Sequence, residues 1–111
     1  MTAEHPPPPQ AASGIVIYAV GRRAELVLSG AVGPEALPEV ERILYSPPLS
    51  HAGEWFLDMR EVTRFDLASA YALIRAITSR TKLPAVTIHG APPMVQRTLR
   101  HTGVHNVATI T

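Results

Sequence analysis

The sequence predicts a single α/β domain with a mixed, mostly parallel sheet of about five strands and alternating helices. Short apolar segments rich in Val and Ile alternate along the chain with segments of helical periodicity. They follow one another in the order β-β-α-β-α-β-α-β, and strands joined through helices pair in parallel because each helix crosses back over the sheet. The chain has 111 residues, which is enough for one hydrophobic core and too few for two.

The predicted sheet begins with an antiparallel hairpin. Residues 14–20 and 25–32 are both apolar and typical of strands, and the tight link at 21–23 favours direct pairing between them. The segment before the hairpin is polar, small and rich in proline. We therefore expect a disordered, Pro-rich tail at 1–13 and a folded domain at 14–111.

The hairpin is followed by a predicted helix that begins near Pro34, a residue suited to the first helical position. The apolar side chains of residues 37–44 share one face. Pro38 is compatible with a helix only within the first turn. Pro47 should end the helix, and residues 49–53 should form a loop that leads into the next strand.

The stretch from Glu54 to Lys82 organises the domain. The apolar run that starts at Trp55 predicts a strand covered on both faces near its start, followed by a short loop. Asp66 precedes a helical pattern, where its carboxylate can accept a hydrogen bond from a first-turn N–H and suits the helix dipole. Spacings of three and four predict a buried stripe of Leu67, Ala70, Tyr71, Ile74 and Ile77. The same periodicity places Ala68, Ser69, Ala72, Arg75, Ala76 and Ser79 off that stripe.

Three further elements complete the predicted domain. Residues 83–90 form a short strand, in which Pro84 fits only at the beginning. A helix over 91–102 follows, with Gly103 as a left-handed C-cap. Residues 107–110 alternate in the manner of a final strand.

Composition excludes several classes of function. The net charge of +1, the absence of a Lys/Arg block and the few aromatic residues argue against nucleic-acid binding. The chain has no cysteine, so disulfides, thiolate metal sites and cysteine nucleophiles are excluded. No apolar run is long enough to cross a bilayer and no signal-like segment opens the chain, so we expect a cytoplasmic protein without membrane insertion.

Candidate catalytic groups do not converge in the sequence. The five histidines are scattered along the chain: His5, His51, His89, His101 and His105. The last two are four residues apart but have no acidic ligand near them in the sequence. Asp58 and Asp66 form no expected pair, and no base, nucleophile and orienting group come together. Gly30, Gly33 and Gly90 do not form a phosphate-binding loop. We therefore predict a protein that is not an enzyme and has no metal or cofactor.

Three stretches resemble the STAS domain, the fold shared by anti-sigma factor antagonists and the cytoplasmic tails of sulphate transporters. Residues 26–32 resemble the family's second strand. Residues 56–66 resemble the strand and loop that end in its Asp-Ser-Ser-Gly or Asp-Thr-Ala-Gly motif. Residues 86–104 resemble its fourth strand, third helix and Gly-bearing helix end. The resemblance covers about residues 15–111, nearly the whole chain.

The resemblance implies a missing phosphorylation site. In this family the residue two after the Asp is a serine or threonine that a partner kinase, itself the anti-sigma factor, phosphorylates. Asp66 matches the Asp, Ala68 the acceptor and Ser69 the Gly, so the acceptor hydroxyl is absent. Ser69 and Thr63 carry the nearest hydroxyls, either as substitute acceptors or as ordinary surface groups. The family also adds a final helix, so we expect one sheet edge or face here to be less covered, or covered by a partner.

The implied function is a non-enzymatic regulatory module, similar to an anti-sigma factor antagonist, that binds an anti-sigma factor of serine-kinase type without phosphoswitching. The expected contact residues are Arg64, Asp66, Ala68, Ser69, Tyr71 and Ala72, with Tyr71 alternatively in the core. Two other functions stay open: a STAS subunit of a larger signalling or transport assembly, and a sensor of a small ligand such as a nucleotide or lipid. The sequence does not decide between a monomer and a homo-oligomer.

Overall fold

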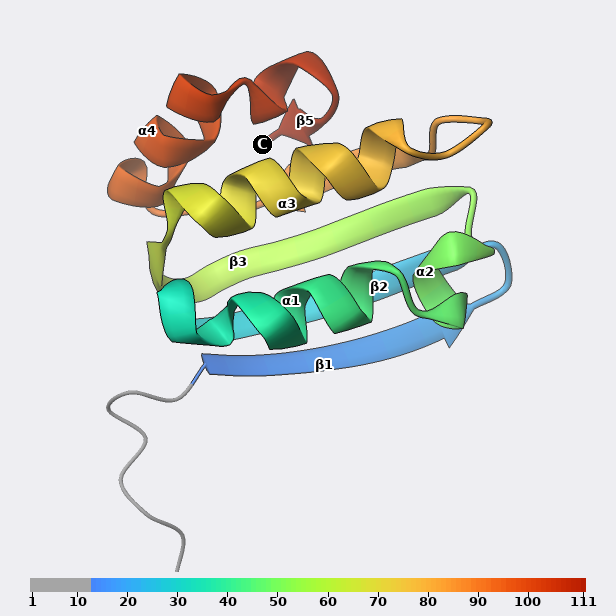
Figure 1. The fold of residues 1–111 in the computed structure, drawn as a ribbon, viewed down its shortest axis with the longest axis horizontal. Helices are drawn as coiled ribbons and strands as arrows, with labels where there is room; N and C mark the ends of the chain where they lie inside the picture. Colours follow the sequence, from blue (N-terminus) through green and yellow to red (C-terminus); the bar gives the residue numbers. More distant parts are fainter. Residues whose placement is uncertain (1–12) are drawn as a thin grey trace, which may run out of the picture.

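The computed structural model describes residues 13–111, which form a five-stranded sheet in the order β1-β2-β3-β4-β5 (Figure 1). The strands are β1 (Ser13–Val20), β2 (Arg23–Val32), β3 (Glu54–Phe65), β4 (Ala85–His89) and β5 (Thr109–Ile110). β1 pairs antiparallel with β2, and all other neighbours are parallel. The predicted mixed, mostly parallel sheet is therefore confirmed. The predicted tail lies outside the described residues, apart from Ser13, which begins β1.

Four helices and two 3-10 turns connect the strands: α1 (Leu37–Leu44), α2 (Pro47–Ser50), α3 (Leu67–Thr78), α4 (Pro93–Thr102), η1 (Pro34–Ala36) and η2 (Val104–Asn106). Pro34 starts a 3-10 turn, and α1 follows with Pro38 in its first turn. The four-residue helix α2 occupies part of the predicted loop. Gly103 ends α4 with φ of 94°, the predicted left-handed cap. No helix within residues 13–111 is both long and apolar enough to cross a membrane.

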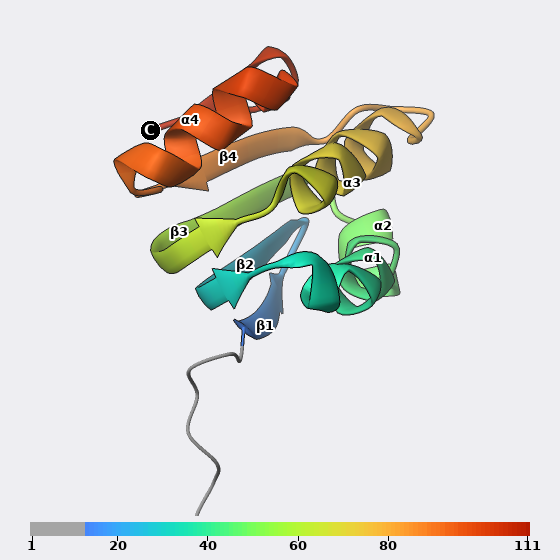
Figure 2. The ribbon, with the colours of Figure 1, turned by 60° about the vertical axis from the view of Figure 1, so that its left-hand side comes forward.

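The helices cover one face of the sheet. Each parallel strand is added beside the previous one, and right-handed crossovers in a constant direction place successive helices on the same side. Figure 1 shows α1 and α3 in front of the sheet and α4 beside α3, and Figure 2 shows the same layering from the side. On β2, Ala24, Leu26 and Leu28 are buried under the helices, whereas the alternate side chains are only partly covered. We call the side of the sheet that faces away from the helices the open face.

The prediction that the start of β3 is covered on both faces is wrong. Trp55 and Leu57 are buried under the helices, but Phe56 lies between them on the open face. There the guanidinium of Arg23 lies 4.7 Å from the centroid of the Phe56 ring. The ring of His89 stacks on the other side, with 5.7 Å between centroids. Two polar neighbours thus cover an aromatic side chain that the apolar run had suggested was buried in a second core layer.

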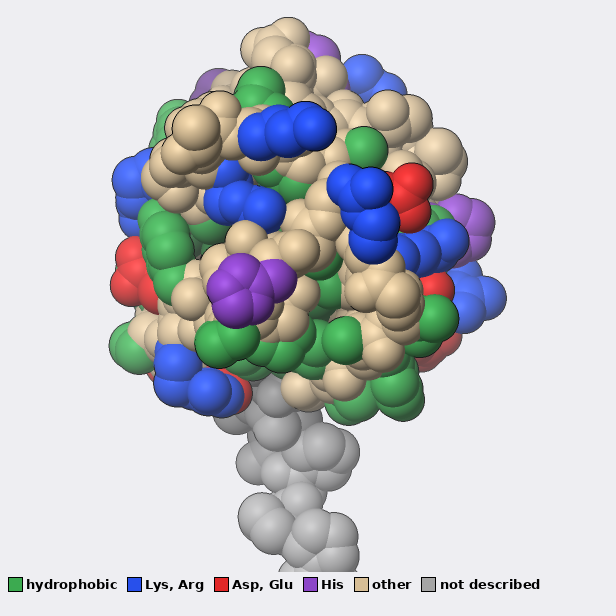
Figure 3. Space-filling model, turned by 90° about the vertical axis from the view of Figure 1, so that its right-hand side faces the viewer, with side chains coloured by type: hydrophobic (Ala, Val, Ile, Leu, Met, Phe, Trp, Pro, Cys, Tyr) green, Lys and Arg blue, Asp and Glu red, His purple; other side chains and the backbone are tan. Residues whose placement is uncertain are grey.

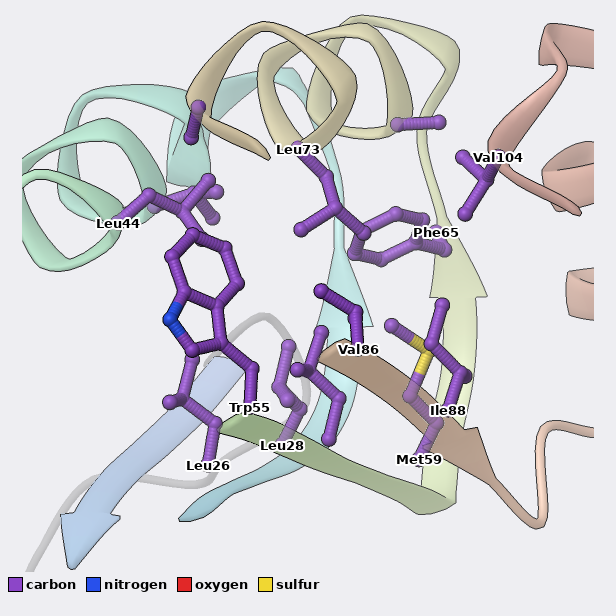
Figure 4. Close-up of a cluster of buried hydrophobic side chains, with 14 of the residues drawn as sticks. Leu26, Leu28, Leu44, Trp55, Met59, Phe65, Leu73, Val86, Ile88 and Val104 are labelled. Atoms are coloured by element: carbon purple, nitrogen blue, oxygen red, sulfur yellow. The ribbon is translucent and has the colours of Figure 1, made fainter. Parts of the chain in front are cut away.

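Trp55 anchors one end of the core (Figure 4). Its indole Nε1 donates a hydrogen bond of 3.0 Å to the carbonyl oxygen of Leu49 in α2. The guanidinium of Arg80 lies 5.7 Å from the Trp55 ring and donates to the carbonyl oxygens of Leu49 and Ala52, at 2.9 and 3.0 Å. The carbonyl oxygen of the buried Leu49 is therefore satisfied by the side chains of Trp55 and Arg80, which hold α2 against this end of the core.

The predicted buried stripe of α3 is partly wrong. Leu67 and Tyr71 are each 47% exposed, whereas Ser69, Ala72 and Ala76 are buried. The reason is that α3 packs on the sheet and also contacts α1 and α4 on its two flanks. Small side chains on these flanks let the neighbouring helices approach closely, and the larger residues point outward. The buried residues of α3 are Ser69, Ala70, Ala72, Leu73, Ala76 and Ile77.

Candidate functional site

The junction between β3 and α3 is tighter than the predicted short loop. β3 extends to Phe65 and α3 begins at Leu67, so Asp66 alone links strand and helix. The backbone N–H of Asp66 donates to the carbonyl oxygen of Val32 at the end of β2, with a distance of 2.9 Å. Phe65 is buried and pairs with Val32. The start of α3 is therefore fixed to the sheet.

Two bulges in β3, where it pairs with β2, determine the direction in which β3 ends at Phe65. The register shifts between Val27 and Ser29 and again between Gly30 and Ala31, and each time β3 contributes an extra residue. As a result the buried positions of β3 change from every second residue to every third, at Met59, Val62 and Phe65. Bulges of this kind bend a strand and re-aim its end, which here carries the junction.

Asp66 caps α3 as predicted. Its Oδ2 accepts a hydrogen bond from the backbone N–H of Ala68 at 3.4 Å, and its extended backbone, with φ −74° and ψ 154°, suits an N-cap. Its Oδ1 lies 3.5 Å from Nη2 of the exposed Arg64. The carboxylate is half-buried, so the positive end of the helix and one arginine offset its charge.

An exposed apolar surface lies beside this cap, between the start of α3 and α4. Met94 is 70% exposed, and together with Leu67 it borders a hollow of ≈ 290 Å³. Met94 also borders a second hollow of ≈ 220 Å³, on the side of Arg64 and Thr63. We call this region the α3–α4 surface. Its lining residues are Thr63, Arg64, Phe65, Leu67, Met94, Val95, Arg97, Thr98 and His101.

Of the predicted contact residues, Arg64 lines this surface, and Asp66 and Ala68 flank its residue Leu67 in the chain. Arg64 and Tyr71 are exposed, and Asp66 and Ala68 are partly exposed. The other two predictions, Ser69 and Ala72, are corrected by the structure, because both side chains are buried against neighbouring elements.

Burial also removes Ser69 from the set of accessible hydroxyls. Its side chain is 0% exposed, and its Oγ has no hydrogen-bond partner among residues 13–111. A kinase could not reach this hydroxyl without opening the contact between α3 and its neighbours. Thr63, by contrast, is exposed near the end of β3.

Sequence reasoning did not assign Leu67 and Met94 to the site. The sequence places Leu67 on the predicted buried stripe, and Met94 only within the helix predicted over 91–102. A signal for Met94 does exist in the sequence. Val95 and Leu99 are both apolar and four apart, which predicts a buried stripe, and the residue before Val95 lies about 100° away from it around the helix.

The remaining candidate groups do not form a site. Asp58 lies at the open face, where Nε and Nη2 of Arg60 donate to its carboxylate at 3.0 and 2.8 Å. These hydrogen bonds hold the pKa of Asp58 below its ordinary value. Along the chain, Asp58 and Asp66 are separated by both bulges of β3. Nδ1 of His89 lies 3.2 Å from Oγ1 of Thr111. Within residues 13–111 no three His, Cys, Asp or Glu side chains gather around one point.

Comparison with solved structures identifies the architecture. The anti-sigma factor antagonist SpoIIAA in its unphosphorylated form matches with a TM-score of 0.67, at 10% sequence identity, over 88% of this chain and 88% of that chain. The chain has a STAS-like fold. No protein-family model matches the sequence, and no curated protein matches it. The expected STAS-like architecture is thus confirmed by structure, at an identity where sequence alone gives only short matching stretches.

Proposed function

We propose that this chain is a non-enzymatic regulatory module that binds another protein through the α3–α4 surface, in the manner of an anti-sigma factor antagonist. The proposed partner is an anti-sigma factor of serine-kinase type. Two findings support this proposal. The fold is similar to that of SpoIIAA, whose solved structure is described as an anti-sigma factor antagonist. Residues 56–66 also resemble the strand and motif that precede the phosphoacceptor in that class.

The observation that carries the proposal is the exposure of large apolar side chains beside the Asp66 cap. Leu67, Tyr71 and Met94 all point outward from helices whose opposite faces already bury a core. A helix that served only to cover the sheet would gain nothing from these side chains in water. Arg64 and Arg97 lie at the margin of the same region. An apolar centre with a charged margin is the usual anatomy of a protein interface.

Because position 68 is alanine, the proposed module should bind its partner without a phosphorylation switch at this turn. A phosphate on this first turn would add about 1.5 to 2 negative charges next to the Asp66 carboxylate, and would disfavour a closely packed interface. Ala68 has no hydroxyl to modify, and the hydroxyl of Ser69 is buried. We therefore propose that binding is not switched at this turn. Thr63, near the end of β3, carries an exposed hydroxyl.

A pair of substitutions at one position tests this proposal. In an affinity purification of the full chain, wild type should retain a kinase-like ATPase, and Ala68→Arg should lose it because a long charged side chain blocks close approach. Ala68→Ser is the matched control, since it adds only a hydroxyl. Without added ATP it should retain the ATPase, and after incubation with ATP intact mass should show one added phosphate and the ATPase should be released. Equal recovery by wild type and Ala68→Arg, with unchanged folding, would contradict the proposed surface.

The interior offers no support for ligand sensing as the main function. The hollow between β1 and α1 is lined by apolar side chains, among them Ile15 and Val40, but its free volume is ≈ 10 Å³. That is about the space of one water molecule. A nucleotide or lipid would have to displace core side chains, so we favour protein binding.

A further inference from the structure

The outer edge of the sheet is formed by β1, which lacks the usual protection of an edge strand. Its eight residues, Ser13–Val20, include no charged side chain and no proline. Its register with β2 runs without a shift from Ser13 opposite Gly30 to Val20 opposite Arg23, so no bulge twists it away. Natural edge strands commonly carry Lys, Pro or a bulge, because their outward N–H and C=O groups are a template for another strand.

The side chains of β1 make this edge apolar as well. Val16, Tyr18 and Val20 lie on the open face and are 48%, 51% and 66% exposed. Ile15 and Ile17, on the helical side, are only partly buried against the core. In Figure 1, β1 forms the edge of the sheet away from α4, and none of the described strands or helices pairs with its outer side.

The N-terminal segment of the same chain is poorly suited to cover this edge. Residues 1–12 precede β1, and an antiparallel return through a two-residue turn at 11–12 would set residues 6–9 opposite residues 14–17. All four of these residues are proline. Proline has no N–H to donate to a ladder, and an edge strand tolerates it only where its nitrogen faces solvent. Four consecutive prolines would place some of these nitrogens toward β1, where the ladder needs a donor. An identical strand meets no such obstacle, and β1 carries no charge that would repel its copy.

We propose that β1 pairs antiparallel with β1 of a second copy of this chain, about a twofold axis that joins the two sheets. Such an interface is self-complementary by symmetry. The two-residue turn makes Val20 and Arg23 a hydrogen-bonded pair, so alternation places the outward backbone groups on Ile15, Ile17 and Ala19. In the proposed register, Ile17 of one copy lies opposite Ile17 of the other. Val16, Tyr18 and Val20 then all lie within the paired segment.

This register makes a specific contact on the open face. Val16 of each copy lies opposite Tyr18 of the other, and the contact occurs twice by symmetry. Directly opposite side chains in an antiparallel pair interact most strongly, so charges at these two positions report the pairing. The α3–α4 surface remains accessible in such a dimer because α4 and β1 lie at opposite edges of the sheet (Figure 1).

Two double substitutions test the proposal by sedimentation velocity and light scattering of the full chain over a series of concentrations. Wild type should associate reversibly to twice its mass of 12.0 kDa. Val16→Lys with Tyr18→Lys sets like charges opposite each other, and should raise the dimer dissociation constant about tenfold or more. Val16→Glu with Tyr18→Lys sets opposite charges against each other and should keep the dimer. Both variants carry Tyr18→Lys, and residue 18 lies opposite Glu25 on β2. Any change that this substitution makes in the monomer is therefore the same in both variants, and the comparison reports on residue 16 alone.

Three outcomes would overturn the pairing. The first is a wild-type chain that stays monomeric at all concentrations, including the case in which its own N-terminal segment protects the β1 amides from hydrogen exchange. The second is a Lys/Lys variant that dimerises like wild type, which would place the interface elsewhere. The third is equal weakening by the Lys/Lys and Glu/Lys variants, which would exclude this register.

Discussion

Ser69→Ala should stabilise the protein, although it removes a polar group next to the Asp66 cap. The Oγ of Ser69 is fully buried and has no hydrogen-bond partner among residues 13–111. A buried hydroxyl without a partner costs about 1–3 kcal/mol, and alanine is a better helix former by up to about 0.5 kcal/mol. The methyl group fills nearly the same space. We expect the free energy of unfolding to rise by about 1–2 kcal/mol.

The matched control is Ser46→Ala, the same chemical change at a hydroxyl that is satisfied. Oγ of Ser46 donates to the carbonyl oxygen of Ile43 at 2.6 Å, so its loss should lower stability by about 0.5–1.5 kcal/mol. Urea unfolding followed by circular dichroism measures both changes, and the thermal midpoint should shift by about 4–8 °C per kcal/mol in a domain of this size. A loss of stability in Ser69→Ala would show that the hydroxyl is hydrogen-bonded in solution and would refute its description as buried without a partner.

Two further predictions concern the backbone and the charges of the sheet. Gly90 has φ of +74°, and a Cβ there would collide with Cγ of Arg60. Gly90→Ala should therefore cost about 1–3 kcal/mol in urea unfolding, and more than Gly21→Ala, where φ is +60° but the space is open; equal costs would show that only the backbone conformation matters. The pKa of Asp58 is lowered mainly by the Arg60 hydrogen bond. Its stabilising contribution is therefore present above the ordinary carboxyl pKa and is lost as the pH falls through the lowered value. Asp58→Asn should be less stable than wild type at neutral pH by up to about 1 kcal/mol, and the difference should shrink in acid; a difference that does not change with pH would contradict this.

Much of the fold could be predicted because proline and glycine mark the boundaries of its elements. Pro34 and Pro47 bracket the first helical segment, and Gly103 ends α4 in the left-handed conformation that the sequence suggests. Short apolar runs then identified the strands in their order, and alternation indicated the last one. The bulges in β3 could not be predicted, because extra residues at a parallel pairing depend on how β2 and β3 fit together rather than on either sequence alone.

The orientation of α3 was harder to predict for a physical reason. Leu67 and Tyr71 are apolar and four residues apart, a spacing typical of a buried stripe, yet they point outward. Serine and alanine give almost no signal about burial, and here they line flanks that contact α1 and α4. The error is informative, because a large apolar residue displaced from the core is a candidate for contact with a partner. The cap at Asp66 was predictable because it depends only on local geometry.

The most direct test of the account is the affinity of a purified kinase-type anti-sigma factor for Met94→Asp, measured by isothermal titration calorimetry beside Leu83→Asp. Leu83 is an exposed apolar residue in the connection between α3 and β4, which Figure 1 shows at the end of α3 away from its start. Figure 3 views the molecule from that side, where hydrophobic and basic side chains are interspersed. A side chain at the centre of an interface contributes about 2 kcal/mol or more, so Met94→Asp should weaken binding about thirtyfold or more, and Leu83→Asp should leave it unchanged. Equal affinities of wild type and both folded variants would show that the partner does not bind the α3–α4 surface.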